Sequence, residues 1–176
     1  MNAQIEKGFN QLEANRKALF DTLKQYPDDL LNKKPSEQAW SVAEVVDHVL
    51  TAEEYSLKYL QKKVQDVANA KPEGFKQKWR WLLIKVVFNF NIKFPAPEVV
   101  APKAGYQTKA QMEARWNENR KQMHSILSKL NDKEINSQLW KHALAGKMNL
   151  HHMVEFLGMH FNRHRKQIDR TLAAVK

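Results

Sequence analysis

Four long stretches of the chain carry apolar residues at intervals of three and four positions. This spacing places them on one face of an α-helix, and such a face must be buried against other helices. The expected helices span residues 3–26, 42–67, 108–130 and 150–174. Their apolar stripes include Ile5, Phe9, Leu12, Leu19 and Leu23; Val45, Val49, Leu60 and Val64; Met112, Trp116, Met123 and Leu127; and Met153, Leu157, Phe161, Ile168 and Leu172. The pattern predicts an all-α, up-and-down four-helix bundle.

Capping residues mark where three of these helices begin. Ser41 can accept a hydrogen bond from the free backbone amides of the second helix, and Glu44, three residues on, can reciprocate. Thr108 and Gln111 have the same spacing, and Asn149 can cap the last helix. We therefore assign the Glu44 carboxylate to the cap.

The length of the chain fits one folded unit. It has 176 residues, of which 43% are hydrophobic, so we expect a single four-helix-bundle domain over residues 1–176. The N-terminal segment lacks the pattern of a signal peptide. The longest apolar run, residues 81–90, is interrupted by Lys85 and is shorter than the ~20 residues of a membrane span. We expect a cytoplasmic protein with no transmembrane segment.

The net charge of +10 comes from 29 Lys and Arg against 19 Asp and Glu. The basic residues are spread over nearly every segment, and no run of like charges or RNA-binding motif occurs. This distribution indicates a solvated basic surface and argues against nucleic acid as the partner. A basic surface would also attract an anionic small-molecule substrate.

Residues 71–94 mix basic and apolar residues, with Phe75, Trp79, Leu82, Val86 and Phe90 at helical spacing. This stretch has three interpretations, which we rank in order. It is a helix packed on the bundle, a surface for a homodimer, or a basic amphipathic helix at a membrane surface. Prolines 95, 97 and 102 then predict a long proline-rich loop over residues 95–107.

Two histidines on the apolar face of the last helix are the main candidates for chemistry. His160 and His164 are four residues apart, so both rings can point at one object. His48 lies among the apolar residues of the second helix and could be a third member. Three imidazoles would leave a metal ion with open positions for water or substrate, as in catalytic zinc sites. Spacing alone leaves open whether these are ligands or hydrogen-bonded core histidines. The chain has no cysteine, so any metal site uses nitrogen and oxygen ligands.

Three short motifs occur in a fixed order: WSVAEVVDHV in the second helix, KHALAG before the last helix, and HFNRHRKQI within it. Together they resemble the DinB/YfiT-like superfamily of four-helix-bundle metalloproteins, over nearly the whole chain. The resemblance implies a divalent metal ion, zinc or nickel, held by His48, His160 and His164. His142 matches a histidine of the loop before the last helix and is a candidate for lining the pocket, although Ala143 stands where proline is usual.

The resemblance also implies a reaction class. Some members resemble thiol-dependent transferases, in which the metal activates a low-molecular-weight thiol, and others are metal-dependent hydrolases. We therefore expect a metal-dependent thiol S-transferase acting on a small molecule through metal-bound thiol or water. The alternatives are a hydrolase, or a non-enzymatic binding or stress-response module.

Other polar residues near the expected site receive lesser roles. Tyr55 and Tyr59, further along the second helix, could reach the pocket or merely pack. His151 and His152 are expected to be exposed at the start of the last helix and not to be ligands. No carboxylate is spaced to act as a general base.

Overall fold

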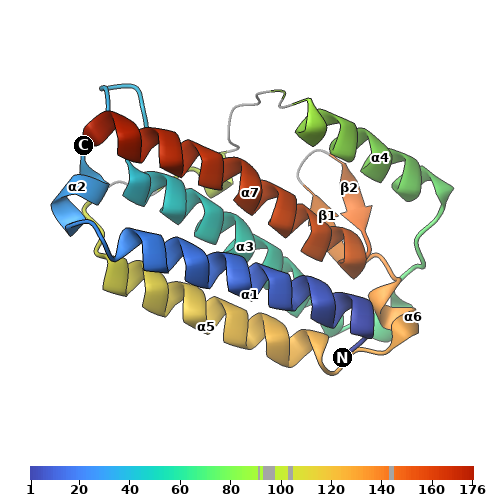
Figure 1. The fold of residues 1–176 in the computed structure, drawn as a ribbon. Helices are drawn as coiled ribbons and strands as arrows, with labels where there is room; N and C mark the ends of the chain where they lie inside the picture. Colours follow the sequence, from blue (N-terminus) through green and yellow to red (C-terminus); the bar gives the residue numbers. More distant parts are fainter. Residues whose placement is uncertain (91, 93–97, 103–104, 143–144) are drawn as a thin grey trace.

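The computed structural model is built from four long helices (Figure 1), and it describes all residues except 91, 93–97, 103–104 and 143–144. The long helices are α1 (Ala3–Leu23), α3 (Val42–Val64), α5 (Lys109–Leu127) and α7 (Leu150–Val175). They correspond to the four expected helices, so the all-α bundle is confirmed. None of the helices in the described part of the chain is long and apolar enough to cross a membrane.

The four helices form a closed ring of contacts in the order α1, α7, α3, α5. The colours of Figure 1 show that α3 and α5 run in one direction, and that α1 and α7 run in the other. The helix directions therefore follow the order up, down, down, up rather than alternating strictly. The reason is the long connection between α3 and α5, which returns the chain to the end of the bundle where α3 began.

Short elements fill the connections. They are α2 (Asp28–Asn32), the 3-10 helix η1 (Val67–Asn69), α4 (Phe75–Asn89), the 3-10 helix η2 (Glu98–Val100), α6 (Asp132–Ile135), and the strands β1 (Trp140–His142) and β2 (Gly146–Met148). The strands form an antiparallel hairpin that pairs Trp140 with Met148 and His142 with Gly146. The sequence did not predict this hairpin, because three-residue strands are too short to show alternation. Gly146 has a φ of +81°, a conformation that glycine adopts without a steric penalty.

The expected caps are present and fix where α3 begins. The backbone amide of Glu44 donates to Ser41 Oγ at 3.1 Å, and the amide of Ser41 donates to Glu44 Oε2 at 2.7 Å. Thr108 and Gln111 form the same reciprocal pair at α5, and the Asn149 side chain accepts a hydrogen bond from the amide of His152 at the start of α7. Because α3 starts at Val42, His48 lies in its second turn and faces α7.

The bundle interior contains a buried charged pair that the apolar stripes do not reveal. Glu53 of α3 is 1% exposed and Arg120 of α5 is 3% exposed. Arg120 Nη2 donates to Glu53 Oε1 at 2.6 Å, and the indole nitrogen of Trp116 donates to Glu53 Oε2 at 2.8 Å. Burial raises the pKa of Glu53, while Arg120 and Trp116 oppose that shift. These contacts join the middle of α3 to α5.

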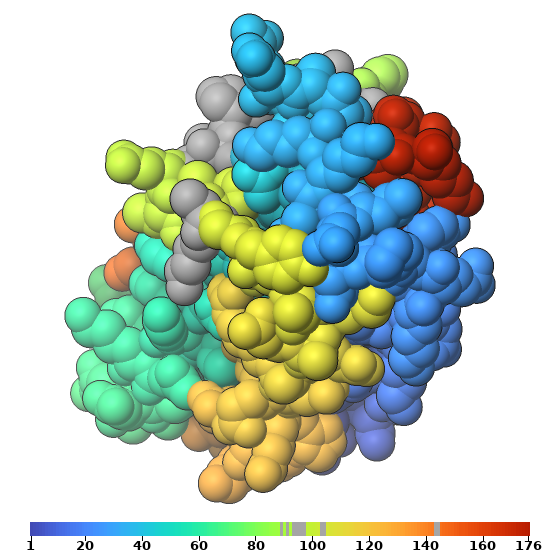
Figure 2. Space-filling view, turned by 90° about the vertical axis from the view of Figure 1, so that its left-hand side faces the viewer, coloured from blue at the N-terminus to red at the C-terminus, as the bar shows by residue number. Residues whose placement is uncertain are grey.

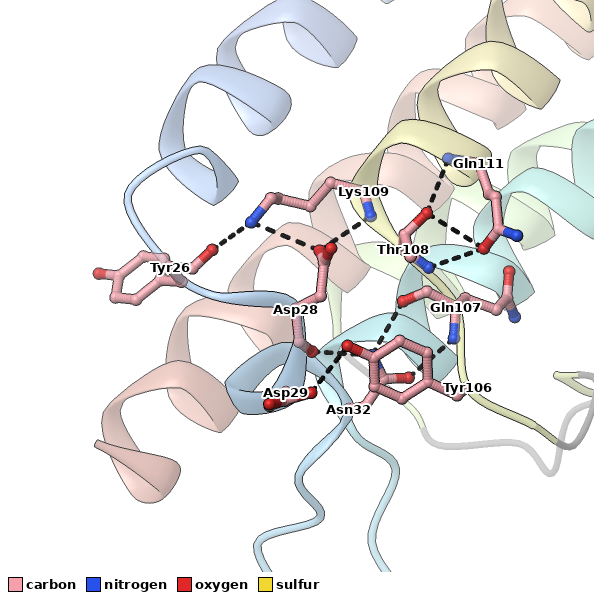
Figure 3. A network of polar contacts seen from close by, with 9 residues as sticks. All are labelled: Tyr26, Asp28, Asp29, Asn32, Tyr106, Gln107, Thr108, Lys109 and Gln111. Carbon is pink, nitrogen blue, oxygen red and sulfur yellow. Dashed lines mark hydrogen bonds and ion pairs between the residues drawn. The ribbon is translucent and has the colours of Figure 1, made fainter.

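The end of the connection that leads into α5 is anchored on α2 (Figure 3). Asn32 and Gln107 exchange two hydrogen bonds: the Asn32 side-chain amide donates to the Gln107 carbonyl at 2.8 Å, and the Gln107 amide donates to Asn32 Oδ1 at 3.1 Å. Tyr106 donates to Asp29 at 2.8 Å, and the backbone amide of Lys109 donates to Asp28 at 3.0 Å. Figure 2 shows this yellow segment lying against the blue surface of α2. The anchor joins residues 106–109 to α2. Residues 95–97 and 103–104 of the expected proline-rich loop lie outside the described residues.

Candidate metal centre

Three histidines from two helices meet inside the bundle. His48 of α3 and His160 and His164 of α7 each offer a ring nitrogen, and the three nitrogens lie within 4.8 Å of one another. The ring centroids are 5.1 Å apart for His48 and His160, 4.7 Å for His48 and His164, and 4.5 Å for His160 and His164. These are the three residues expected from the sequence to form a metal site, and the fold brings them together.

The rings are largely shielded from solvent. His48 is 3% exposed and His160 is 9% exposed, whereas His164 is half-buried. Burial lowers the pKa of all three imidazoles, that of His164 to about 4 and that of His160 well below its ordinary value. The neighbouring histidines lower the pKa of His160 and His164 as well. All three rings are therefore neutral at pH 7, which is the form that coordinates a metal ion.

Hydrogen bonds determine which nitrogen of two rings carries the proton. His48 Nδ1 lies 2.6 Å from the carbonyl oxygen of Val100 in η2, and His164 Nδ1 lies 2.9 Å from Oε1 of Gln167. Both partners are oxygens that can only accept a hydrogen bond, so we assign the proton to Nδ1 in each ring. The lone pair of each ring is then on Nε2. This is the arrangement in which metal-binding histidines are usually held by their outer partners.

His160 differs from the other two. Its Nδ1 is buried and has no hydrogen-bond partner among the residues that the structure describes. A core histidine kept for structural reasons would normally have its buried nitrogens paired, because an unpaired buried polar atom is costly. The cluster is therefore not a self-sufficient hydrogen-bonded core. The donor set of three neutral imidazoles fits a divalent ion such as zinc or nickel.

Aromatic rings enclose the cluster on two sides. The indole of Trp40, just before the cap of α3, lies 5.1 Å from the His48 ring. Phe156, one turn before His160, stacks on its ring at 5.4 Å with an angle of 22° between the planes. On these two sides the apolar rings limit the access of water and strengthen electrostatic interactions at the site.

His142 of the hairpin lies one ring away from the cluster. Its ring contacts the ring of Phe156 edge-on, with the ring centroids 4.6 Å apart, and Phe156 in turn stacks on His160. The backbone amide of Ala145 donates to His142 Nδ1 at 3.2 Å, so the proton of the neutral ring is on Nε2. Burial lowers the pKa of His142 to about 4. The structure thus places His142 beside the cluster but outside the three-histidine group.

The carboxylates nearest to His48 in the chain are already engaged. Asp47 is fully buried and accepts a hydrogen bond from Arg115 of α5, which also pairs with Glu54. Glu44 completes the helix cap and lies 2.9 Å from Lys34. The interpretation of Glu44 as a capping residue is confirmed.

The tyrosines of α3 lie away from the cluster. Tyr55 and Tyr59 follow His48 by seven and eleven residues, which places them about 10 and 16 Å along the helix axis. Tyr55 is exposed, and Tyr59 is half-buried with Lys63 over its ring. Neither has a contact with the three histidines among the described residues, and their role in a pocket stays a prediction.

The histidines at the start of α7 require one correction. His151 and His152 were expected to be exposed, but both are half-buried. The ring of His152 stacks on Trp81 of α4 at 4.7 Å, and its Nδ1 lies 2.9 Å from Glu73 Oε1. For His152 the reason is that Trp81 of α4 covers its ring. Neither residue belongs to the three-histidine group, as expected.

Sequence reasoning did not identify the partners that hold the histidine rings. Gln167 had a usable signal, since it lies three residues after His164 and therefore on the same helix face. The Val100 carbonyl had none, because a backbone group in a connecting segment has no sequence signature. Its position follows from the packing of η2 against α3.

Comparisons with known proteins agree with this arrangement. Residues 11–168 match the family model described as the DinB superfamily. The chain is also similar to the uncharacterized protein YuaE of Bacillus subtilis (strain 168), with 26% identity over 149 residues that cover 85% of this chain and 87% of YuaE. The range matched by the family model, residues 11–168, contains all three histidines of the cluster.

Proposed function

Because the chain belongs to the DinB superfamily, we propose that His48, His160 and His164 hold a catalytic divalent metal ion, zinc or nickel. The family and the three-histidine group together fit a metal-binding DinB-like protein. We further propose that the protein is a transferase that joins a low-molecular-weight thiol to an electrophilic small molecule.

One observation carries the metal assignment. His48 and His164 both have Nδ1 next to an oxygen acceptor, so both present the lone pair of Nε2 within the cluster. The buried Nδ1 of His160 has no hydrogen-bond partner among the described residues, which a hydrogen-bonded core histidine would normally have. A metal ion is the partner that three converging neutral imidazoles accept most readily.

The protein residues around the cluster favour a thiol over water as the nucleophile. When bound, a divalent cation acts as a Lewis acid and lowers the pKa of a thiol or water that coordinates it. Among the described residues, the nearby carboxylates Glu44 and Asp47 are held by the cap and by Arg115, so neither is placed to take a proton. A thiol, with an ordinary pKa of about 8.5, depends less on such a base than water does.

The metal assignment is tested by elemental analysis of protein purified without a histidine tag. We expect stoichiometric metal in the wild type and in His124→Ala, and loss of metal in His48→Ala and His160→Ala. His124 is the matched control because it is a histidine on the outer side of α5, packed against Phe9. Full occupancy in the His48 and His160 variants would contradict the assignment.

The reaction class is tested by turnover of small electrophiles with and without added thiols. Turnover that requires both the thiol and the metal supports the transferase. Thiol-independent, metal-dependent cleavage would identify a hydrolase instead. A metal-loaded protein without turnover in either assay would support the binding or stress-response module.

A further inference from the structure

Helix α4 has two apolar faces on opposite sides. Trp81 and Ile84 are buried against the bundle, with Phe88 partly buried beside them. The opposite face carries six apolar residues that are between 42% and 83% exposed: Phe75, Trp79, Leu82, Leu83, Val86 and Phe90. A helix needs only one apolar face to pack on its own bundle. The second face therefore requires a separate explanation.

The inner face is held in place by specific contacts with α7 and the hairpin. The indole nitrogen of Trp81 donates to Glu155 Oε2 at 3.1 Å, and its ring stacks on His152. Lys85 Nζ lies 3.4 Å from the other oxygen of Glu155. On the hairpin side, Arg80 Nη1 donates to the Ala145 carbonyl at 3.3 Å. These contacts fix the rotation of α4, so its outer face points away from the bundle (Figure 1).

The outer face is narrow and is bordered by positive charge. At about 100° per residue, its six apolar side chains cover an arc of roughly 100°. Lys76 and Arg80 follow on one side of this arc, and Lys78 and Lys85 on the other. The helix contains no acidic residue. Lys76 and Lys78 are exposed, and neither makes an ion pair within 4 Å among the residues that the structure describes. Burial raises the pKa of Glu73 and Lys78 is near enough to oppose that shift, so the charge of Lys76 is the less engaged of the two.

We propose that the outer face of α4 docks the protein on an anionic lipid surface, with the helix lying in the plane of the interface. An apolar stripe with Trp and Phe inserts at the level of the headgroups, and flanking Lys and Arg contact anionic phosphates. The net charge of +10 acts in the same direction by attracting the whole molecule to such a surface. The proposal does not depend on the metal centre.

A second copy of the chain fits this face less well. Two α4 helices packed face to face would bring together the basic borders of both, with no acidic residue on either helix to neutralise them. The stripe is also small. A 15-residue helix is roughly 22 Å long, so a strip about 10 Å wide covers roughly 220 Å², against about 800 Å² per partner in a typical stable interface.

Sedimentation with lipid vesicles tests the proposal. We expect the wild type to bind vesicles of phosphatidylcholine with phosphatidylglycerol at least about tenfold more strongly than vesicles of phosphatidylcholine alone. The apolar variant Phe75→Ser/Trp79→Ser should lower the partition coefficient on anionic vesicles about tenfold or more. Circular dichroism checks that it retains its helix content.

Charge variants provide the matched control. Lys76→Glu/Lys78→Glu should weaken binding as strongly as the apolar variant, whereas Lys7→Glu/Lys17→Glu, with the same change in net charge on α1, should bind almost as the wild type does. An equal loss of vesicle binding in the two charge variants would overturn the role of α4. Wild-type protein that remains in the supernatant with both vesicle types would overturn it as well. Analytical ultracentrifugation adds one more outcome. A dimer that is abolished by Phe75→Ser/Trp79→Ser would assign the face to a second copy and refute lipid docking.

Discussion

Replacement of Gln167 by leucine tests whether the protein orients its histidines for a metal ion. Gln167 lies on α7 one turn after His164, and its Oε1 is 2.9 Å from His164 Nδ1. Leucine has a similar volume but no acceptor, so the change removes this hydrogen bond and leaves the three proposed ligands intact. The corresponding partner of His48 is the Val100 carbonyl, which no side-chain substitution removes.

The expected loss follows from the position of the two groups. Removal of an outer partner typically lowers metal affinity by about 10- to 100-fold. His164 and Gln167 are both half-buried, so water can replace part of the lost hydrogen bond. We therefore expect Gln167→Leu to raise the Kd about tenfold, which corresponds to ~1.4 kcal/mol. Gln167→Glu should bind at least as tightly as the wild type, because a carboxylate acceptor makes the imidazole more basic.

The measurement is competition with a chelator of known affinity at pH 7, with zinc and then nickel. Gln11→Leu is the matched control, since the Gln11 side chain donates to Asn15 one turn away on α1, far from the histidines. The reasoning is refuted if Gln167→Leu and Gln11→Leu bind metal with the same affinity while His160→Ala does not bind it.

Three further predictions concern stability and are measured by urea denaturation. Glu53→Gln should lower the unfolding free energy by about 3–5 kcal/mol, because it removes the carboxylate 2.6 Å from the buried Arg120 guanidinium and leaves only Glu13, at 3.6 Å, as a counter-charge; a loss below about 1 kcal/mol would contradict this. Gly8→Ala should lower the unfolding free energy by about 1–3 kcal/mol despite the higher helix propensity of alanine, because the added Cβ would lie 2.6 Å from Val154 Cγ1. In the Val154→Ala background, which removes this clash, the same substitution should cost much less. Metal-free protein should lose stability as the pH falls from about 6.5 towards 4, because burial holds the pKa of His142 at about 4 in the folded protein and the unfolded chain therefore takes up protons first. Each such histidine contributes a slope of up to about 1.4 kcal/mol of unfolding free energy per pH unit. His142→Asn should make the unfolding free energy depend less on pH.

The four bundle helices were predictable because their stability depends on features that are local in sequence. Apolar residues at helical spacing determine which face is buried, and the Ser41–Glu44 pair determines where α3 starts. Together these place His48, His160 and His164 on inward faces. The three histidines come together because α3 packs on α7 in the fold. The sequence pattern is compatible with this packing but does not specify it.

The parts that could not be predicted depend on contacts between distant segments. The parallel course of α3 and α5 depends on the connection that contains α4, and no local pattern encodes its path. The Val100 carbonyl reaches His48 because η2, which lies in that connection, packs against α3. The apolar stripe on residues 75–90 was visible in the sequence, but only the structure separates its buried face from its exposed one.

One stripe of α7 shows why spacing alone does not assign a role. Four residues of α7 follow one another at four-residue intervals and share one helix face: His152, Phe156, His160 and His164. Along this face the side chains contact different elements. Trp81 of α4 stacks on His152, the hairpin residue His142 contacts Phe156, and only His160 and His164 lie opposite His48. The same residue type at the same interval therefore anchors a helix at one end of the stripe and forms a candidate metal site at the other. What distinguishes them is the facing histidine on α3, whose position is set by the cap at Ser41.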